Sequence, residues 1–252
     1  MKHSKYLNIA VCLILVLVAG TGTVQAQDTM IFRADQHPET GETKLHGTLE
    51  PGTHVQLLGY GGSCQGVVSS TYSQEMVNHL AQFSAVDLGE GCDGIGNIFA
   101  GVNNAAMSYE PVTLQESVAG FDAAAHFDAA REAAAQVVDF SSYDFASAEP
   151  VALASLSQDG VNVDLVMYHV DDANGGTSFY DSQILVAFSN GTAQAFLYGC
   201  WDYLKQGVFL LDGDLYIASE WRCCACGGDA YTISVFTPDG FVPILLNTDF
   251  DA

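Results

Sequence analysis

The sequence predicts an α+β fold that is predominantly antiparallel β-sheet. Its C-terminal half consists of short apolar runs, and in Val161–Met167 apolar residues recur at every second position. Asn-Gly and Asp-Gly pairs separate several of these runs. Such pairs favour two-residue hairpin turns, because both central residues must accept positive φ. One alanine-rich stretch interrupts the pattern and has high helix propensity. Apolar residues make up 49% of the chain, which is enough to form a core.

The first 26 residues have the pattern of a cleavable export signal. Two lysines precede the apolar run Ile9–Ala19, and Val24 and Ala26 provide the small residues that a signal peptidase requires. The apolar run is about half of the roughly 20 residues that cross a bilayer as a helix. We therefore expect cleavage after Ala26 and a secreted or periplasmic protein without a transmembrane span.

The remaining chain divides into three regions by its pattern. Residues 27–112 predict a small β-rich region, and residues 113–146 predict a helical connector whose helix covers 122–139. Residues 147–252 predict a C-terminal antiparallel meander of about eight strands, because serial hairpins place sequence neighbours side by side. A barrel, a sandwich and propeller-like blades all remain open for this meander. Within the first region, residues 73–83 are expected to form a short helix.

The chain is strongly acidic. All 30 acidic residues but only five of the seven lysines and arginines follow residue 26, so the formal charge of the mature chain is −25. Nucleic-acid binding requires clustered lysine and arginine, and anionic membrane surfaces attract the same residues. The sequence therefore argues against nucleic acids and anionic lipids as partners.

Six cysteines remain after signal cleavage. An even number in an exported chain predicts disulfides, although spacing alone does not define their connectivity. Proximity favours a bridge between Cys64 and Cys92, with Cys200 bonded to one member of the later cluster and the other two paired locally. A Cys-x-Cys pair beside a third thiol is also a ligand set for a soft metal ion. The six cysteines are Cys64, Cys92, Cys200, Cys223, Cys224 and Cys226.

Cys64 has a second interpretation. The stretch Gly62–Gly66 has the G-x-C-x-G form of the strand–turn–helix elbow that exposes a nucleophile in α/β-hydrolases. The following residues favour a strand, however, and no series of parallel βα units is predicted. A catalytic triad would also require a histidine such as His126 or His169, and no motif marks either one.

Acidic loops suggest a calcium site. Asp171, Asp172 and Asn174 bring carboxylate and amide oxygens together beside two glycines, and calcium prefers such ligands. The spacing does not match an EF-hand loop, and Asp, Asn and Gly also form ordinary turns.

Taken together, these patterns predict a non-enzymatic binding or structural protein at the cell exterior, stabilised by calcium. The alternative is a secreted hydrolase with Cys64 as nucleophile.

Overall fold

A computed structural model describes residues 29–37, 39–76, 80–116, 121–122, 124–137, 143–172, 182–198, 207–222 and 228–250. In this part of the chain, antiparallel strands predominate beside one α-helix and two short 3-10 helices. The strands form three sheets, one of which closes into a barrel. The predominantly antiparallel β fold expected from the sequence is confirmed.

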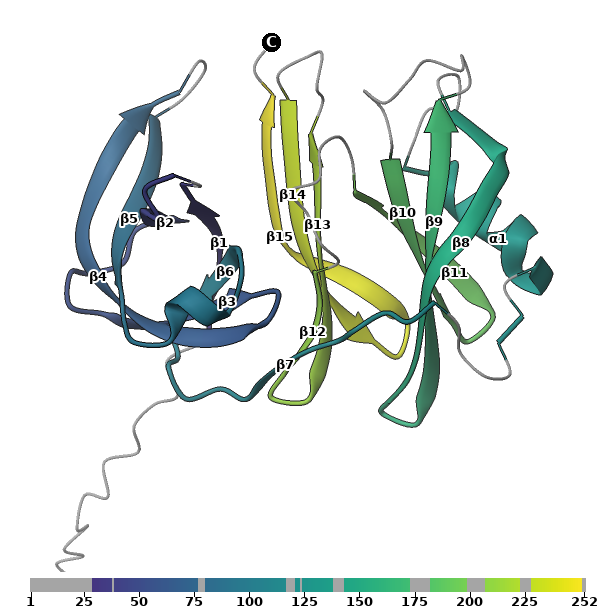
Figure 1. Ribbon diagram of the computed structural model, residues 1–252, viewed down its shortest axis with the longest axis horizontal. Helices are drawn as coiled ribbons and strands as arrows, with labels where there is room; N and C mark the ends of the chain where they lie inside the picture. The colour runs from purple at the N-terminus through teal and green to yellow at the C-terminus, as the bar shows by residue number, and fades with distance from the viewer. Residues whose placement is uncertain are drawn as a thin grey trace, which may run out of the picture.

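The N-terminal unit is a closed barrel of six antiparallel strands (Figure 1). Their order around the barrel is β1-β2-β5-β4-β3-β6, and closure leaves no free sheet edge within this unit. A short 3-10 helix, η1 (Cys92–Gly94), lies between the last two strands in sequence. The strands are β1 (Ile31–Gln36), β2 (Thr43–His46), β3 (His54–Gly59), β4 (Gly62–Glu75), β5 (Leu80–Leu88) and β6 (Ile98–Val102).

Large apolar side chains fill the barrel, and two glycines make room for them. Leu45 and Leu57 are fully buried in its core. A Cβ atom at Gly101 would lie 2.7 Å from a methyl carbon of Leu45, and one at Gly66 would lie 2.5 Å from a methyl carbon of Val86. These distances are shorter than van der Waals contact, so any side chain at either glycine would displace the core.

The C-terminal part of the chain forms two further sheets that pack face to face. One sheet has the order β11-β10-β9-β8 and the other has the order β15-β14-β13-β12-β7. The buried side chains between them include Leu165, Leu185, Leu215, Ile217 and Phe236. The meander of eight strands from β8 to β15 is therefore a sandwich rather than a barrel. The strands are β7 (Tyr109–Pro111), β8 (Tyr143–Gln158), β9 (Val161–Asp172), β10 (Ser182–Ser189), β11 (Thr192–Tyr198), β12 (Gly207–Leu211), β13 (Asp214–Arg222), β14 (Gly228–Thr237) and β15 (Gly240–Phe250).

Three of the expected hairpin turns have the backbone geometry that their sequence favours. They are Asp159-Gly160, Asn190-Gly191 and Asp212-Gly213. The first residue of each has φ between 50° and 52°, and the glycine has φ between 75° and 91°. Two successive positive φ angles define the type I′ turn, whose twist matches that of the flanking strands.

The helix of the connector is shorter than expected. The 3-10 helix η2 (Ala124–His126) leads into α1 (Phe127–Ala134), whereas the sequence suggested residues 122–139. A side-chain oxygen of Asp122 accepts hydrogen bonds from the backbone N–H groups of Ala124 and Ala125, at 3.0 and 3.3 Å, and so starts the helical segment. The buried face of α1 is formed by small alanines, which pack on the four-stranded sheet.

Residues 73–83 do not form the expected short helix. Strand β4 extends to Glu75 and strand β5 begins at Leu80, and the two residues are partners in the ladder. Phe83, the last residue of the expected helix, lies in β5 and stacks on Tyr72 with 5.6 Å between ring centroids. Cross-strand pairing in this long hairpin outweighs a weak helical periodicity.

The division of the chain also differs from the sequence-based one at two points. Strand β8 begins at Tyr143, so the boundary expected at residue 147 falls inside a strand. Pro150 is tolerated there because β8 is an edge strand. Strand β7, from the expected N-terminal region, pairs with β12 of the five-stranded sheet.

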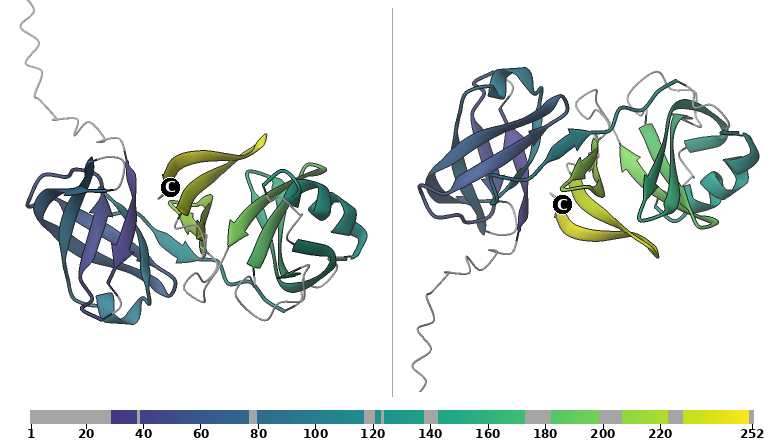
Figure 2. Two further views of the ribbon diagram at one scale, coloured as in Figure 1. Left: turned by 90° about the horizontal axis from the view of Figure 1, so that it is seen from above. Right: turned by 90° about the horizontal axis from the view of Figure 1, so that it is seen from below.

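The three units form a layered arrangement (Figure 2). The five-stranded sheet lies between the barrel on one face and the four-stranded sheet on the other, and α1 covers the outer face of the four-stranded sheet. No helix within the described ranges is long and apolar enough to cross a membrane. The expected export signal, residues 1–26, lies outside the described residues.

Candidate functional site

The barrel packs on the five-stranded sheet through a largely apolar interface. Leu58, Phe99 and Val102 on the outside of the barrel contact a buried patch that includes Phe209 and Ile233. The inward-facing residues of strands β3 and β6 fill the barrel, so their outward-facing residues are free to form this second core. The interface therefore joins residues that are far apart in the sequence.

Two tyrosines fasten the sheet to the backbone of the barrel. The hydroxyl of Tyr231 donates a hydrogen bond of 2.7 Å to the carbonyl oxygen of Phe99. The hydroxyl of Tyr109 donates one of the same length to the carbonyl oxygen of Gly59. Burial raises the pKa of both tyrosines well above the ordinary value near 10. Both phenols therefore stay protonated and remain donors.

An ion-pair network crosses the same interface. The guanidinium of Arg33, in β1, lies 3.1 Å from Asp35 of the same strand and 3.3 Å from Glu220 in β13. Arg33 is only 4% exposed, and its guanidinium lies 5.3 Å from the centroid of the Tyr231 ring. Charges buried to this extent require close partners, and removal of one partner leaves the other uncompensated.

Asp35 also lies close to two further basic side chains, those of His46 and Lys44. His46 Nε2 lies 2.7 Å and Lys44 Nζ lies 3.8 Å from one of its oxygens. Burial alone would raise the pKa of Asp35. The hydrogen bond from His46 and the charges of Arg33, His46 and Lys44 outweigh burial, and together they hold this pKa well below 3.8. Asp35 is therefore ionised throughout the physiological range.

Beside this network the interface contains a pocket of about 160 Å³. The ring centroids of Tyr60 and Phe99, which form part of its wall, lie 5.1 Å apart. Thr113 is exposed and lies at the mouth. Burial, with the charge of Glu220 and the neighbouring Tyr109, raises the pKa of Tyr60 well above 10. The pocket is lined by Tyr60, Phe99, Tyr109, Pro111, Val112, Thr113, Gly207 and Val208.

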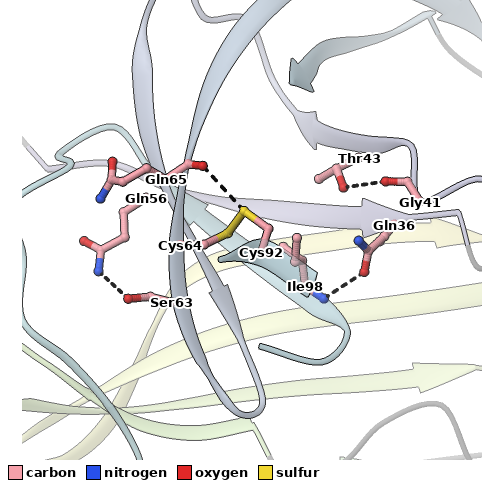
Figure 3. The surroundings of a disulfide bond; sticks show 9 residues. All are labelled: Gln36, Gly41, Thr43, Gln56, Ser63, Cys64, Gln65, Cys92 and Ile98. Carbon is pink, nitrogen blue, oxygen red and sulfur yellow. Dashed lines mark hydrogen bonds between the residues drawn. A yellow bond between two sulfur atoms is a disulfide. The ribbon is translucent and has the colours of Figure 1, made fainter. Parts of the chain in front are cut away.

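The expected disulfide between Cys64 and Cys92 is present (Figure 3). It links β4 to η1, and the two Cα atoms lie 5.2 Å apart. Both residues are buried in the barrel core. The covalent link therefore connects residues that are 28 positions apart inside the N-terminal unit.

The geometry around Cys64 does not provide a nucleophile elbow. Cys64 is paired with Leu57 within the β3–β4 ladder, and β4 continues as a strand. Its sulfur is bonded to Cys92, so it offers no free thiol. His126 stacks on Phe121 with 4.9 Å between ring centroids, and His169 is paired with Gln183 in β10. Neither histidine belongs to the barrel that contains Cys64.

The remaining predicted site residues fall largely outside the described ranges. Cys200, Cys223, Cys224, Cys226 and Asn174 all lie in segments that the structure does not describe. Asp171 and Asp172 belong to the end of β9 rather than to a loop, and Asp144 of β8 is the ladder partner of Asp171. Among the described residues, no group of three or more histidines, cysteines, aspartates and glutamates is arranged to hold a metal ion.

Reasoning from the sequence missed the pocket and the ion-pair network. One available signal was Arg33, a cation between apolar residues of a strand in a chain that has few cations. Such a residue indicates a buried ion pair, but the sequence does not identify Glu220, which is 187 positions away, as its partner.

A comparison of the chain with protein-family models, curated proteins and solved structures finds no match.

Proposed function

We propose that this is a non-enzymatic binding protein of the cell exterior, secreted or periplasmic, whose ligand occupies the pocket between the barrel and the five-stranded sheet. The pocket is the observation that carries the proposal. It lies where two units meet, which is a frequent location of ligand sites, and its wall combines aromatic rings with a few polar groups.

The size of the pocket limits the ligand to one small group. An engineered apolar cavity of about 150 Å³ holds a benzene molecule, and the present volume is about 160 Å³. The site therefore suits a single ring or a group of similar bulk, which belongs to a small molecule or projects from a larger partner.

Two features support the location and the absence of catalysis. The N-terminal 26 residues have the export pattern, and buried disulfides are typical of proteins in oxidising compartments. A hydrolase with Cys64 as nucleophile would require a free thiolate, but the sulfur of Cys64 is bonded to that of Cys92. The formal charge of −25 after cleavage further argues against nucleic acids and anionic lipids as partners.

Calcium stabilisation remains part of the proposal. Asp171, Asp172 and Asn174 lie close together in the sequence and offer two carboxylates and one amide oxygen. In a chain with this excess of acidic residues, a bound divalent cation relieves local repulsion between carboxylates.

Saturation-transfer NMR on the full mature chain tests the binding role. The probes are phenol, methyl glucoside and choline, each at millimolar concentration. We expect at least one probe to bind the wild type and to lose binding in Thr113→Trp, because the indole ring closes the mouth of the pocket. The matched control is Thr71→Trp, an exposed residue of β4 outside the pocket. Equal binding of every probe to both variants, or binding of none, would refute the assignment of the site.

A further inference from the structure

We infer that the pocket is specific for a methylated ammonium group, the chemistry shared by choline and by trimethylated lysine. This inference rests on the proposed binding function and names the class of its ligand. It combines three observations: the aromatic wall, the sign of the neighbouring charge and the apolar part of the lining.

The first observation is the aromatic wall. Tyr60, Phe99 and Tyr109 all line the pocket, and each comes from a different strand or connection. Further rings support them, because Phe209 lies with its centroid 5.5 Å from that of Phe99 and 5.6 Å from that of Tyr109. The faces of aromatic rings carry negative potential and attract organic cations. Rings held in a packed cluster are already ordered before the ligand arrives, which lowers the entropic cost of binding.

The second observation is the charge beside the wall. Glu220 is the ladder partner of Tyr231, whose hydroxyl donates to the carbonyl oxygen of Phe99 in the wall. Burial raises the pKa of the Tyr60 phenol, and the negative charge of Glu220 raises this pKa further. Arg33 does not reverse the sign, because its guanidinium is shared between Asp35 and Glu220. The mature chain also carries 30 acidic residues against five lysines and arginines. A field of this sign concentrates cations near the pocket and repels anions.

The third observation is the apolar part of the lining. Pro111, Val112 and Val208 contribute apolar surface, and the hydroxyl of Tyr109 already donates to Gly59. A primary ammonium would lose its hydrogen bonds to water on entering the site and would find the hydroxyls of Tyr60 and Thr113 as acceptors among the side chains of the lining. A quaternary ammonium has no N–H group to satisfy, and its methyl groups favour contact with aromatic and apolar surface.

Calorimetry on the full mature chain, with choline against its neutral isostere 3,3-dimethylbutan-1-ol, tests the inference. The two molecules share shape and differ in charge. We expect choline and tetramethylammonium to bind with a dissociation constant of about 1 mM, and the isostere to bind about tenfold more weakly, since cation–π attraction is absent. Sodium chloride at the same ionic strength controls for screening.

Variants of Tyr60 separate the ring from the hydroxyl. We expect Tyr60→Leu to weaken choline binding about tenfold and Tyr60→Phe to change it less than about twofold, because only the first removes the ring. Tyr72→Leu removes an exposed tyrosine from β4, outside the pocket, and serves as the control. Melting curves verify folding, and Thr113→Trp provides a second means of blocking the site if Tyr60→Leu does not fold.

The outcomes distinguish the inference from the proposed function. Equal binding of choline and the isostere, both lost in Thr113→Trp, would overturn the preference for a cation and leave the binding role in place. Binding of phenol or methyl glucoside without choline would have the same meaning. A peptide with trimethylated lysine, compared with its unmodified form, separates the two sources: tighter binding of this peptide than of choline identifies a protein partner, and the reverse identifies a free small molecule.

Discussion

The side-chain amide of Gln194, in β11, binds the backbone of Phe241, in β15, at both of its polar ends. Its Nε2 group donates to the carbonyl oxygen of Phe241 and its Oε1 atom accepts from the N–H group of Phe241, each at 2.9 Å. The amide thus takes the place of a neighbouring strand at the edge of the five-stranded sheet. Because β11 belongs to the other sheet, the pair also joins the two halves of the sandwich.

The same edge has a second protection. In an antiparallel hairpin, the backbone N–H and C=O groups of successive residues point alternately towards the partner strand and away from it. Those of Phe241 point away from β14, and Pro243, two residues later, occupies the next position of this kind. Proline has no N–H group to offer there, and the ladder shifts register beside it. The first half of β15 therefore resists pairing with another chain, although Val242 and Ile244 are exposed.

We predict that Gln194→Ala destabilises the protein by about 1–3 kcal/mol, because two backbone groups of Phe241 lose their partner. Gln74→Ala, at an exposed position of β4, is the control and is expected to stay within about 0.5 kcal/mol of the wild type. Urea unfolding curves measure both. Equal stabilities of the two variants would contradict a structural role for the Gln194 amide.

We predict that loss of the Cys64–Cys92 disulfide in the double variant Cys64→Ala with Cys92→Ala lowers stability by about 3–4 kcal/mol. The bridge spans 28 residues, and in the chain-entropy account a cross-link restricts the unfolded state by this amount. Denaturant unfolding measures the loss. Mass spectrometry after thiol labelling without reductant provides the structural check: modification of Cys64 in the native wild type would show that the bridge is not formed in solution.

We predict an acid-sensitive contribution from Asp35. Its pKa is held below 3.8 in the folded protein, so its ionised form stabilises the fold above that pH, and the contribution is lost as pH falls towards its folded value. Asp35→Asn should therefore be less stable than the wild type at pH 7, and the difference should narrow between about pH 5 and pH 2. Thermal unfolding across this range measures it, with exposed Asp87→Asn as the control. A difference that stays constant with pH would contradict the ion-pair network.

We predict that millimolar calcium raises the melting temperature more than magnesium does at equal ionic strength. The double variant Asp171→Asn with Asp172→Asn should abolish the excess, because it removes two carboxylates and calcium prefers carboxylate oxygens as ligands. Glu50→Gln with Glu90→Gln removes the same charge at two exposed positions and should retain the excess. Identical shifts from both ions in the wild type would mean that calcium acts only through screening.

We predict that the exported protein begins at Gln27, because Val24 and Ala26 flank the expected cleavage site. N-terminal sequencing of protein recovered from the medium or periplasm measures this directly. If the protein isolated from its natural source retains Ile9–Ala19, the prediction is wrong, and that apolar segment would instead anchor the protein to a membrane.

Local features of the fold were predictable because their causes are local. The turns at Asp159, Asn190 and Asp212 follow from the demand for positive φ at adjacent residues, and the strand count follows from the runs between such turns. The Cys64–Cys92 bridge was predictable because no alternative partner lies near either residue. These inferences require only the chemistry of neighbouring positions.

Features that depend on distant partners were not predictable. Alternation of apolar and polar residues indicates a strand but does not identify its neighbour, so closure of β1–β6 into a barrel and pairing of β7 with β12 required the structure. The pocket is formed by residues from Tyr60 to Val208. No spacing within the sequence relates these residues, and the candidate site therefore became visible only with the tertiary arrangement.

The five-stranded sheet is covered by the barrel on one face and by the four-stranded sheet on the other, and this arrangement has a consequence for folding during synthesis. The barrel is complete in sequence once residue 102 has emerged, so it can close before the strands of the sandwich are available. Its outer patch around Leu58 and Phe99 has no cover until β12 to β14 arrive, more than a hundred residues later. During that interval the closed barrel exposes this apolar patch to solvent, and exposed apolar surface makes a folding intermediate prone to aggregation. Strands β12 to β14 thus cover an apolar surface that the barrel by itself would leave exposed.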